Sequence, residues 1–215
     1  MSTAASDLPQ PRFARMYPKA AARAERRGAT DHRRQLLQGL SGRVVEIGAG
    51  NGLNFAHYPG TVTEVVAIEP EPTLRADAED AASRAPVPVT VAAGTADALP
   101  LGDDEVDAAV ASLVLCSVPD QARALTELRR VIRPGGELRF YEHVRSRRPG
   151  FARFQDLSAL VWPRLMGGCE PNRQTLAAIE GAGFRIERCR GFGFPADARA
   201  YPVLPRILGA ARVSP

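Results

Sequence analysis

The stretch from Val44 to Gly52 constrains the fold of this chain more than any other. An apolar run that includes Glu46 is followed by glycines at alternate positions, Gly48, Gly50 and Gly52. This order predicts a strand, a tight turn and the start of a helix. Glycine adopts positive φ and lets a ligand approach where a Cβ atom would clash. A helix N-terminus beyond such a turn offers free N–H groups to an anion.

The spacing of these glycines also narrows the range of ligands that the turn could bind. The dinucleotide-binding pattern G-x-G-x-x-G requires glycine at position 53, where this chain has Leu53. The glycine spacing therefore argues against NAD as the ligand and favours another ligand of the adenosine type.

Strand and helix patterns alternate through the rest of the chain, and several strands are near-continuous apolar runs typical of buried parallel strands. This predicts an α/β fold with a doubly wound, mostly parallel, seven-stranded sheet whose ligand site lies at the carboxyl ends of the strands. The expected strands are 43–47, 64–69, 87–92, 106–113, 137–144, 185–189 and 207–213. The expected helices are 53–57, 72–83, 120–131 and 173–182.

Two regions fall outside the alternation. Residues 1–40 are expected to form an N-terminal helical cap on a domain spanning 41–215, with 1–18 irregular and 19–40 helical apart from a break around Gly28. Residues 146–172 form an insertion with apolar residues at largely helical spacing. The insertion either roofs the strand ends as an active-site lid or packs on the flank of the sheet.

Composition indicates one globular domain of 215 residues. No apolar run approaches the roughly 20 residues that span a bilayer, and the N-terminus lacks the apolar core of a signal peptide. We expect a cytoplasmic protein without a membrane anchor, a monomer or a homodimer. Cys116, Cys169 and Cys189 are widely spaced, so no disulfide framework and no metal site is expected.

Charge is distributed unevenly along the chain. Residues 1–43 carry 9 basic and 3 acidic side chains, residues 44–138 carry 6 and 15, and residues 139–215 carry 13 and 6. Basic ends are compatible with a nucleic-acid partner or with an arginine-rich solvated surface. We favour the solvated surface, because no aromatic residues are interleaved with the basic ones as in nucleic-acid-binding motifs.

Four residues near predicted strand ends are candidates for chemistry. Glu69 follows Gly52 by 17 residues and is placed to accept hydrogen bonds from ribose hydroxyls. Asp97 either accepts from an adenine amine or caps its own turn. Cys116 is a nucleophile or a small buried residue, and packing is favoured. His143, which follows Glu142, either accepts a proton from a substrate or is hydrogen-bonded to a loop.

Together these segments resemble the class I S-adenosylmethionine (SAM)-dependent methyltransferases. The motifs are VVEIGAGNG, AIEPEP, GTADALPLGDDEVDAAVA, SLVLCSVPD and LRRVIRPGGELRFYEHV, in the family's order. The resemblance implies SAM as cofactor and S-adenosylhomocysteine as product. The cofactor contacts that it implies are Glu46, Gly48, Gly50, Asn51, Gly52, Glu69, Pro70, Ala96, Asp97 and Leu113.

A second resemblance, to one branch of this family, concerns the molecule that accepts the methyl group. LVLCSV, RPGG, EHV and GGC-x-x-x-R are similar to a branch near the ubiquinone/menaquinone-type methyltransferases, which includes membrane-anchored alkyl-thiol methyltransferases. It implies a small-molecule nucleophile, a thiol first and then a hydroxyl of a phenol, quinone or secondary metabolite. His143 is the expected catalytic residue. The expected substrate contacts are Tyr17, Cys116, Trp162 and Arg173.

Two other functions stay open from the sequence. The basic terminal regions are compatible with methylation of RNA or protein, although nucleic acid is not the favoured partner. A glycine turn indicates binding alone, so a non-catalytic SAM-binding protein is the third hypothesis.

Overall fold

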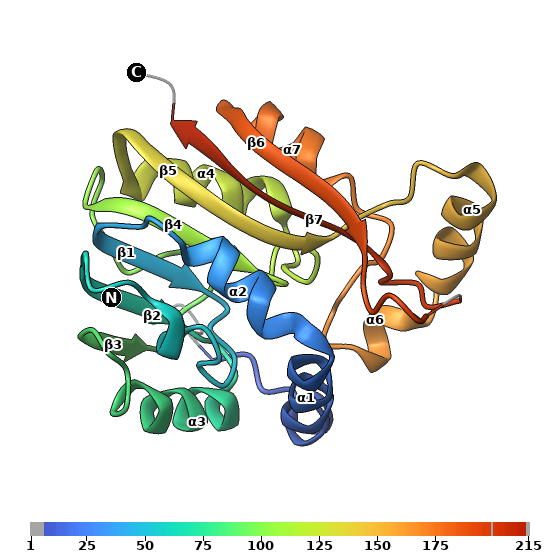
Figure 1. Ribbon diagram of the computed structural model, residues 1–215, viewed down its shortest axis with the longest axis horizontal. Coiled ribbons are helices and arrows are strands. Elements are labelled where there is room, and N and C mark those ends of the chain that lie inside the picture. Colours follow the sequence, from blue (N-terminus) through green and yellow to red (C-terminus); the bar gives the residue numbers. More distant parts are fainter. Residues whose placement is uncertain (1–6, 199, 214–215) are drawn as a thin grey trace.

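The computed structural model describes residues 7–198 and 200–213, and its centre is a seven-stranded sheet (Figure 1). The strand order is β3-β2-β1-β4-β5-β7-β6, and β7 runs antiparallel to β5 and β6 while the other pairs are parallel. The expected fold class is thereby confirmed. The strands are β1 (Gly42–Ile47), β2 (Val62–Ile68), β3 (Val89–Ala92), β4 (Val106–Ser112), β5 (Ile132–His143), β6 (Phe184–Gly193) and β7 (Pro205–Val213).

Helices cover both faces of the sheet, as the near-continuous apolar strands require. Successive strand residues point to opposite faces, so Val44 belongs to one buried cluster and Val45 to the other. Helices α4 (Gln121–Val131) and α7 (Thr175–Gly181) pack on the face of Val45, and α2 (Thr30–Leu37) and α3 (Pro72–Ala82) on the face of Val44 (Figure 1).

The topology places the carboxyl ends of β1, β2, β3 and β4 along one edge of the sheet. These four strands are neighbours and all run parallel. The order reverses between β1 and β4, because β2 follows β1 on one side and β4 joins it on the other. A crevice forms outside the strand ends at such a switch point.

The N-terminal segment is more helical than its prolines suggest. Helix α1 (Pro11–Ala24) begins within the stretch expected to be irregular, so that prediction was wrong for residues 11–18. Proline is well suited to the first helical turn, and Pro11 occupies it. The expected break is confirmed, since Gly28 has φ 102° within the π-helical turn η1 (Glu25–Ala29) that joins α1 to α2.

The helix expected directly after the glycine turn does not form. Residues 53–57 contain only a single 3₁₀ turn, η2 (Phe55–His57). Pro59 favours extended backbone at the residue before it, and Tyr58 has φ −65° and ψ 131°. The turn therefore lacks the helix N-terminus that we expected to face an anion.

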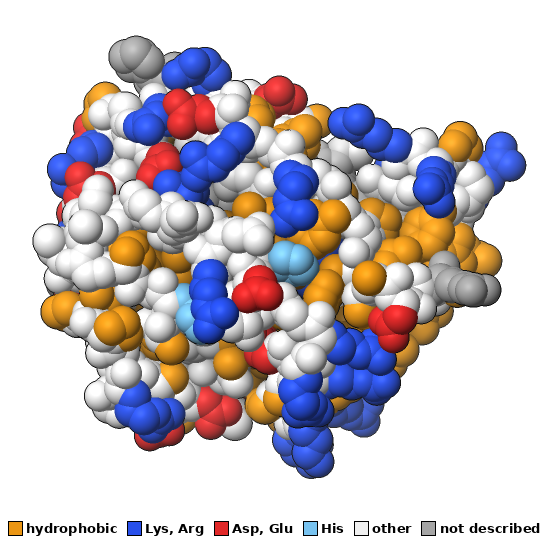
Figure 2. All heavy atoms as spheres, viewed as in Figure 1, with side chains coloured by type: hydrophobic (Ala, Val, Ile, Leu, Met, Phe, Trp, Pro, Cys, Tyr) orange, Lys and Arg blue, Asp and Glu red, His pale blue; other side chains and the backbone are white. Residues whose placement is uncertain are grey.

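The inserted segment projects beyond the end of the sheet (Figure 1). It contains α5 (Pro149–Ser158) and α6 (Trp162–Leu165), and Figure 2 shows hydrophobic side chains gathered over this region. Leu157 and Leu160 are 68% and 64% exposed, so their helical spacing does not mark a buried face. Among the described residues, no helix has the length and apolarity that crossing a membrane requires.

Arg139 joins the end of α2 to the middle of β5. Its Nε and Nη2 donate to the Glu137 carboxylate at 2.8 and 3.0 Å, and its Nη1 donates to the backbone oxygens of Leu36 and Gln38 at 3.2 and 3.1 Å. Removing one partner of a buried ion pair leaves the other uncompensated. We therefore expect Arg139→Ala to lower the free energy of unfolding by about 3 kcal/mol in chemical denaturation.

The matched control is Arg34→Ala. Arg34 pairs with Asp31 on the surface, where both side chains are more than 60% exposed. Its loss should change the free energy of unfolding by no more than about 0.5 kcal/mol. Equal stability of the two variants would show that Arg139 does not hold α2 to the sheet.

Candidate functional site

A cavity of about 660 Å³ opens at the carboxyl ends of the parallel strands. This volume is typical of a site for a small organic ligand. One wall comes from the residues after β1, β2, β3 and β4, among them Gly48, Glu69 and Leu113. The other side comes from α1 and from the end of the inserted segment, including Phe13 and Gly168.

Glu69 holds the glycine turn in place. One carboxylate oxygen accepts the Gly50 N–H at 2.7 Å and the other accepts the Glu71 N–H at 2.9 Å. Glu69 is buried yet lines the cavity, and burial raises its pKa, opposed by these two N–H groups. A carboxylate has about four lone-pair sites, so acceptor capacity is left for ligand hydroxyls.

The turn itself depends on glycine. Gly48, Gly50 and Gly52 all have positive φ, between 58° and 75°. A Cβ atom at Gly48 would lie 2.4 Å from Val114 Cγ2, and one at Gly52 would lie 2.7 Å from Ala81 Cβ. At Gly50 the nearest atoms belong to the Tyr17 ring, at 3.1 Å.

Three of the expected cofactor contacts lie outside this cavity. Glu46 is buried below the turn, where it accepts from Asn54 Nδ2 at 2.8 Å and from the Tyr58 hydroxyl at 2.7 Å. Burial raises the pKa of Glu46 to about 7. Asn51 and Gly52 border a separate, smaller hollow. These three residues therefore shape the glycine turn from the side that faces away from the cavity.

The other expected cofactor contacts line the cavity. They include Asp97, which is half-buried on the loop after β3, and Leu113, which follows β4. Leu113 has φ 60°, unusual for a residue with a side chain, and its N–H donates to the Tyr141 carbonyl at 2.7 Å. The cavity-lining members of the expected set are Gly48, Gly50, Glu69, Pro70, Ala96, Asp97 and Leu113.

Glu142 organises the loop that follows β4. Its carboxylate is fully buried and accepts the N–H groups of Val114, Leu115 and Cys116 at 3.0, 2.9 and 3.2 Å. Burial raises the pKa of Glu142, and the three donors oppose this. Although Glu142 precedes His143 in the sequence, its carboxylate binds this loop. The only sequence signal for Glu142 was its position at the end of a strand, beside His143. That position did not predict the hydrogen bonds between its carboxylate and the loop after β4.

Two of the four expected substrate contacts line the cavity. Tyr17 projects from α1 onto the glycine turn, and burial raises its pKa. Arg173 donates to the Leu115 carbonyl at 2.7 Å and pairs with Glu170 at 3.0 Å. Cys116 and Trp162 are not among the lining residues.

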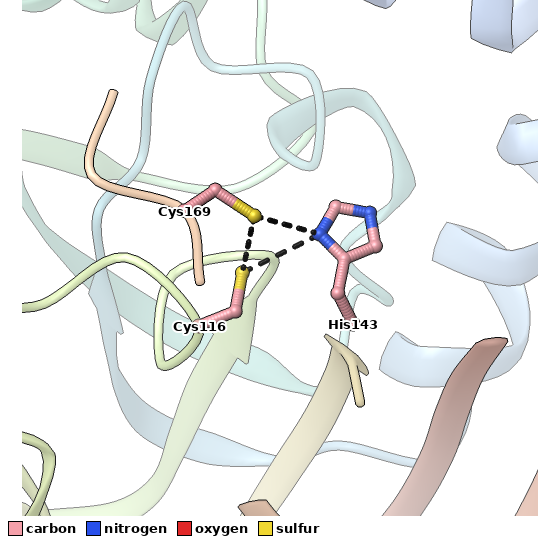
Figure 3. A group of neighbouring side chains, drawn as sticks. All are labelled: Cys116, His143 and Cys169. Carbon is pink, nitrogen blue, oxygen red and sulfur yellow. Dashed lines mark hydrogen bonds between the residues drawn. The ribbon is translucent and has the colours of Figure 1, made fainter. Parts of the chain in front are cut away.

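His143 lies behind the cavity wall rather than in it. Its Nδ1 is 3.4 Å from the sulfur atoms of both Cys116 and Cys169, and the two sulfurs are 3.7 Å apart (Figure 3). Burial lowers the pKa of His143. Its catalytic role stays a prediction that this geometry does not favour, because the strand end turns the ring toward the two thiols.

Comparisons with known proteins agree with this arrangement. Residues 45–140 match a family model described as a methyltransferase domain. Thiol S-methyltransferase TMT1B of Homo sapiens is 34% identical over 186 residues, covering 81% of this chain and 73% of the relative. The chain belongs to the class I SAM-dependent methyltransferases.

Two further proteins extend the comparison of this methyltransferase. Thiol S-methyltransferase TMT1A of Homo sapiens is 37% identical over 158 residues, covering 70% of this chain and 64% of the relative. A solved SAM-dependent methyltransferase of Thermotoga maritima, a possible histamine N-methyltransferase, has a TM-score of 0.69 at 21% identity and covers 94% of this chain and 98% of its own. The latter likeness shows the fold.

The strand-end wall fits the SAM cofactor of the family. Gly48 and Gly50 present bare backbone to the cavity, and Glu69 offers buried acceptor oxygens beside them. When bound, SAM supplies a methyl group on a positively charged sulfur. The residues that would hold it are Gly48, Gly50, Glu69 and Asp97.

Glu69→Gln tests this wall. The amide keeps the size of the side chain but replaces one acceptor oxygen with a donor, which then opposes either the Gly50 N–H or the Glu71 N–H and leaves fewer acceptor sites for ribose hydroxyls. We expect SAM affinity in calorimetry to fall about tenfold to a hundredfold, or roughly 1.5–3 kcal/mol. Glu64→Gln, on β2 but paired with Arg43 away from the cavity, should leave SAM affinity unchanged. Unchanged affinity in Glu69→Gln would move the ribose site elsewhere.

Gly50→Val tests the turn. A β-branched residue is strained at φ 58°, and its side chain would enter the space shared with Tyr17. We expect a folded protein by circular dichroism with SAM affinity reduced at least about a hundredfold. Gly60→Val is the control, since nothing lies within 4 Å of a Cβ atom there. A folded Gly50→Val protein that binds SAM normally would exclude the turn from the site.

Proposed function

We propose that this methyltransferase transfers the methyl group of SAM to the sulfur atom of a small-molecule thiol. The acceptor binds in the half of the cavity formed by α1 and the segment from Pro163 to Arg173. The cavity is large enough for a cofactor and a small acceptor, and many of its lining residues are apolar. The similar human proteins are thiol S-methyltransferases, which supports the same acceptor.

The observation that carries the proposal is the absence of a strong base. Within the described part of the chain, no histidine, lysine or cysteine lines the cavity. Several carboxylates that do line it already have partners. Glu71 and Asp120 cap helices α3 and α4, and Glu170 pairs with Arg173.

A thiol needs less help from the protein than a hydroxyl. A free thiol has a pKa of about 8.5 and is partly ionised near neutral pH, whereas a phenol has a pKa of about 10. The tasks left to the protein are to align the sulfur with the methyl group and to exclude water. Hydroxyl acceptors therefore rank second.

Tyr17 is placed to position the acceptor. Its hydroxyl lies 3.1 Å from the point that a Cβ atom of Gly50 would occupy. This point is where α1 meets the strand-end wall of the cavity. Because burial raises its pKa, the phenol stays protonated and is a hydrogen-bond donor rather than a base. The acceptor sulfur, or the thiolate formed from it, is a suitable partner.

The test compares thiols with alcohols of the same carbon skeleton. Production of S-adenosylhomocysteine and of the methylated acceptor is followed by mass spectrometry. We expect turnover with alkyl or aryl thiols and none with the alcohols. Since the thiolate is the attacking species, kcat/KM should rise about tenfold per pH unit below the pKa of the acceptor and level off above it.

Gly50→Val protein is the control for this assay, because loss of SAM binding must abolish the product. Faster turnover of the alcohol than of the thiol would contradict the proposal. So would a thiol rate that does not change between pH 6 and pH 9, because it would mean that ionisation of the acceptor is not part of the reaction.

A further inference from the structure

Two cysteines and a histidine, side chains of types that ligate metals, converge beside the cavity from separate parts of the chain. Cys116 lies on the loop after β4, His143 ends β5, and Cys169 lies on the inserted segment after α6. Figure 3 shows both sulfur atoms and the near ring nitrogen of His143 pointing at one another. Their ligand atoms all lie within 4.8 Å of one another.

The distances match those of a tetrahedral metal centre. With zinc–sulfur bonds of about 2.3 Å and zinc–nitrogen bonds of about 2.05 Å, tetrahedral angles place two sulfurs about 3.8 Å apart and a sulfur and a nitrogen about 3.6 Å apart. The structure has 3.7 Å between the sulfurs and 3.4 Å from each sulfur to Nδ1. We propose that Cys116, His143 and Cys169 form a binding site for a thiophilic divalent metal ion, with zinc the best match.

Charge balance favours a metal at this place. Binding converts two thiols to thiolates and releases their two protons to solvent, while the imidazole stays neutral. A divalent ion with two thiolates has no net charge. Such a centre suits the surroundings, where the apolar side chains of Val203, Trp162 and Met166 pack against the two cysteines.

A metal ion at this site would join the inserted segment, which forms one side of the cavity, to the strand ends. Cys169 follows Gly167 and Gly168, which line the cavity, while Cys116 and His143 belong to the sheet edge. The backbone already joins the two sides once, because the Glu170 N–H donates to the Cys116 carbonyl at 2.8 Å. Since none of the three ligands lines the cavity, the metal has a structural role here, independent of the acceptor proposed above.

Metal content of the full chain tests the site, and the protein is prepared without a polyhistidine tag. Wild-type protein should carry about one zinc ion per chain by mass spectrometry of the elements. The double variant Cys116→Ala/Cys169→Ala should carry less than about a tenth of that. Cys189→Ser is the matched control and should keep its metal, because Cys189 is the exposed cysteine of the described chain.

Titration of metal-free wild-type protein with Co²⁺ gives a result that does not depend on folding of the variant. We expect thiolate-to-cobalt charge-transfer absorption, visible bands of tetrahedral cobalt, and release of about two protons per ion. Absence of this thiolate signal would overturn the proposal. Equal metal content in the double variant would also overturn it, as would metal-free purified protein with Cys116 and Cys169 joined in a disulfide.

Discussion

The buried carboxylate of Glu142 is the constraint on which the site depends. It ends a core strand and binds three successive backbone N–H groups of the loop after β4. A buried carboxylate without donors is costly, so this loop cannot leave without exposing or orphaning the charge. The position of the loop then sets the cavity wall at Leu113 and the sulfur of Cys116 behind it.

A second carboxylate performs the same task on the other side of the switch point. Glu69 binds the Gly50 N–H and lines the cavity, while Glu46 holds Asn54 and Tyr58 beneath the turn. The strand-end wall of the cavity is thus held in place by carboxylates that accept hydrogen bonds from neighbouring N–H and O–H groups. In the described structure no histidine, lysine or cysteine lines the cavity, and Glu170 on the acceptor side is paired with Arg173. This is consistent with an acceptor that ionises unaided.

The elements that sequence patterns predicted poorly differ from expectation for separate physical reasons. Prolines suggested irregular chain before residue 19, yet α1 forms because Pro11 suits its first turn. A helix was expected at 53–57, but the Asn54 side chain there bonds to Glu46, and Pro59 follows. Apolar spacing in the insertion suggested a buried face, although Leu157 and Leu160 are exposed. Proline geometry, a local preference, accounts for α1 and contributes to the end of the turn at residue 58, while a tertiary hydrogen bond and the lack of a covering element account for the other differences.

The sequence by itself determined the seven-stranded fold, and seven of the ten cofactor contacts that it predicted line the cavity. Apolar strands, alternating helices and the glycine spacing are local patterns with direct physical meaning. Only the tertiary structure decided that His143 faces two thiols instead of the cavity, and that Tyr17 covers the glycine turn. Cys116 and Cys169 are separated by 53 residues, and no local pattern records that a loop and an insertion bring them together. Such contacts arise from packing across the sheet edge, where separation along the chain no longer matters.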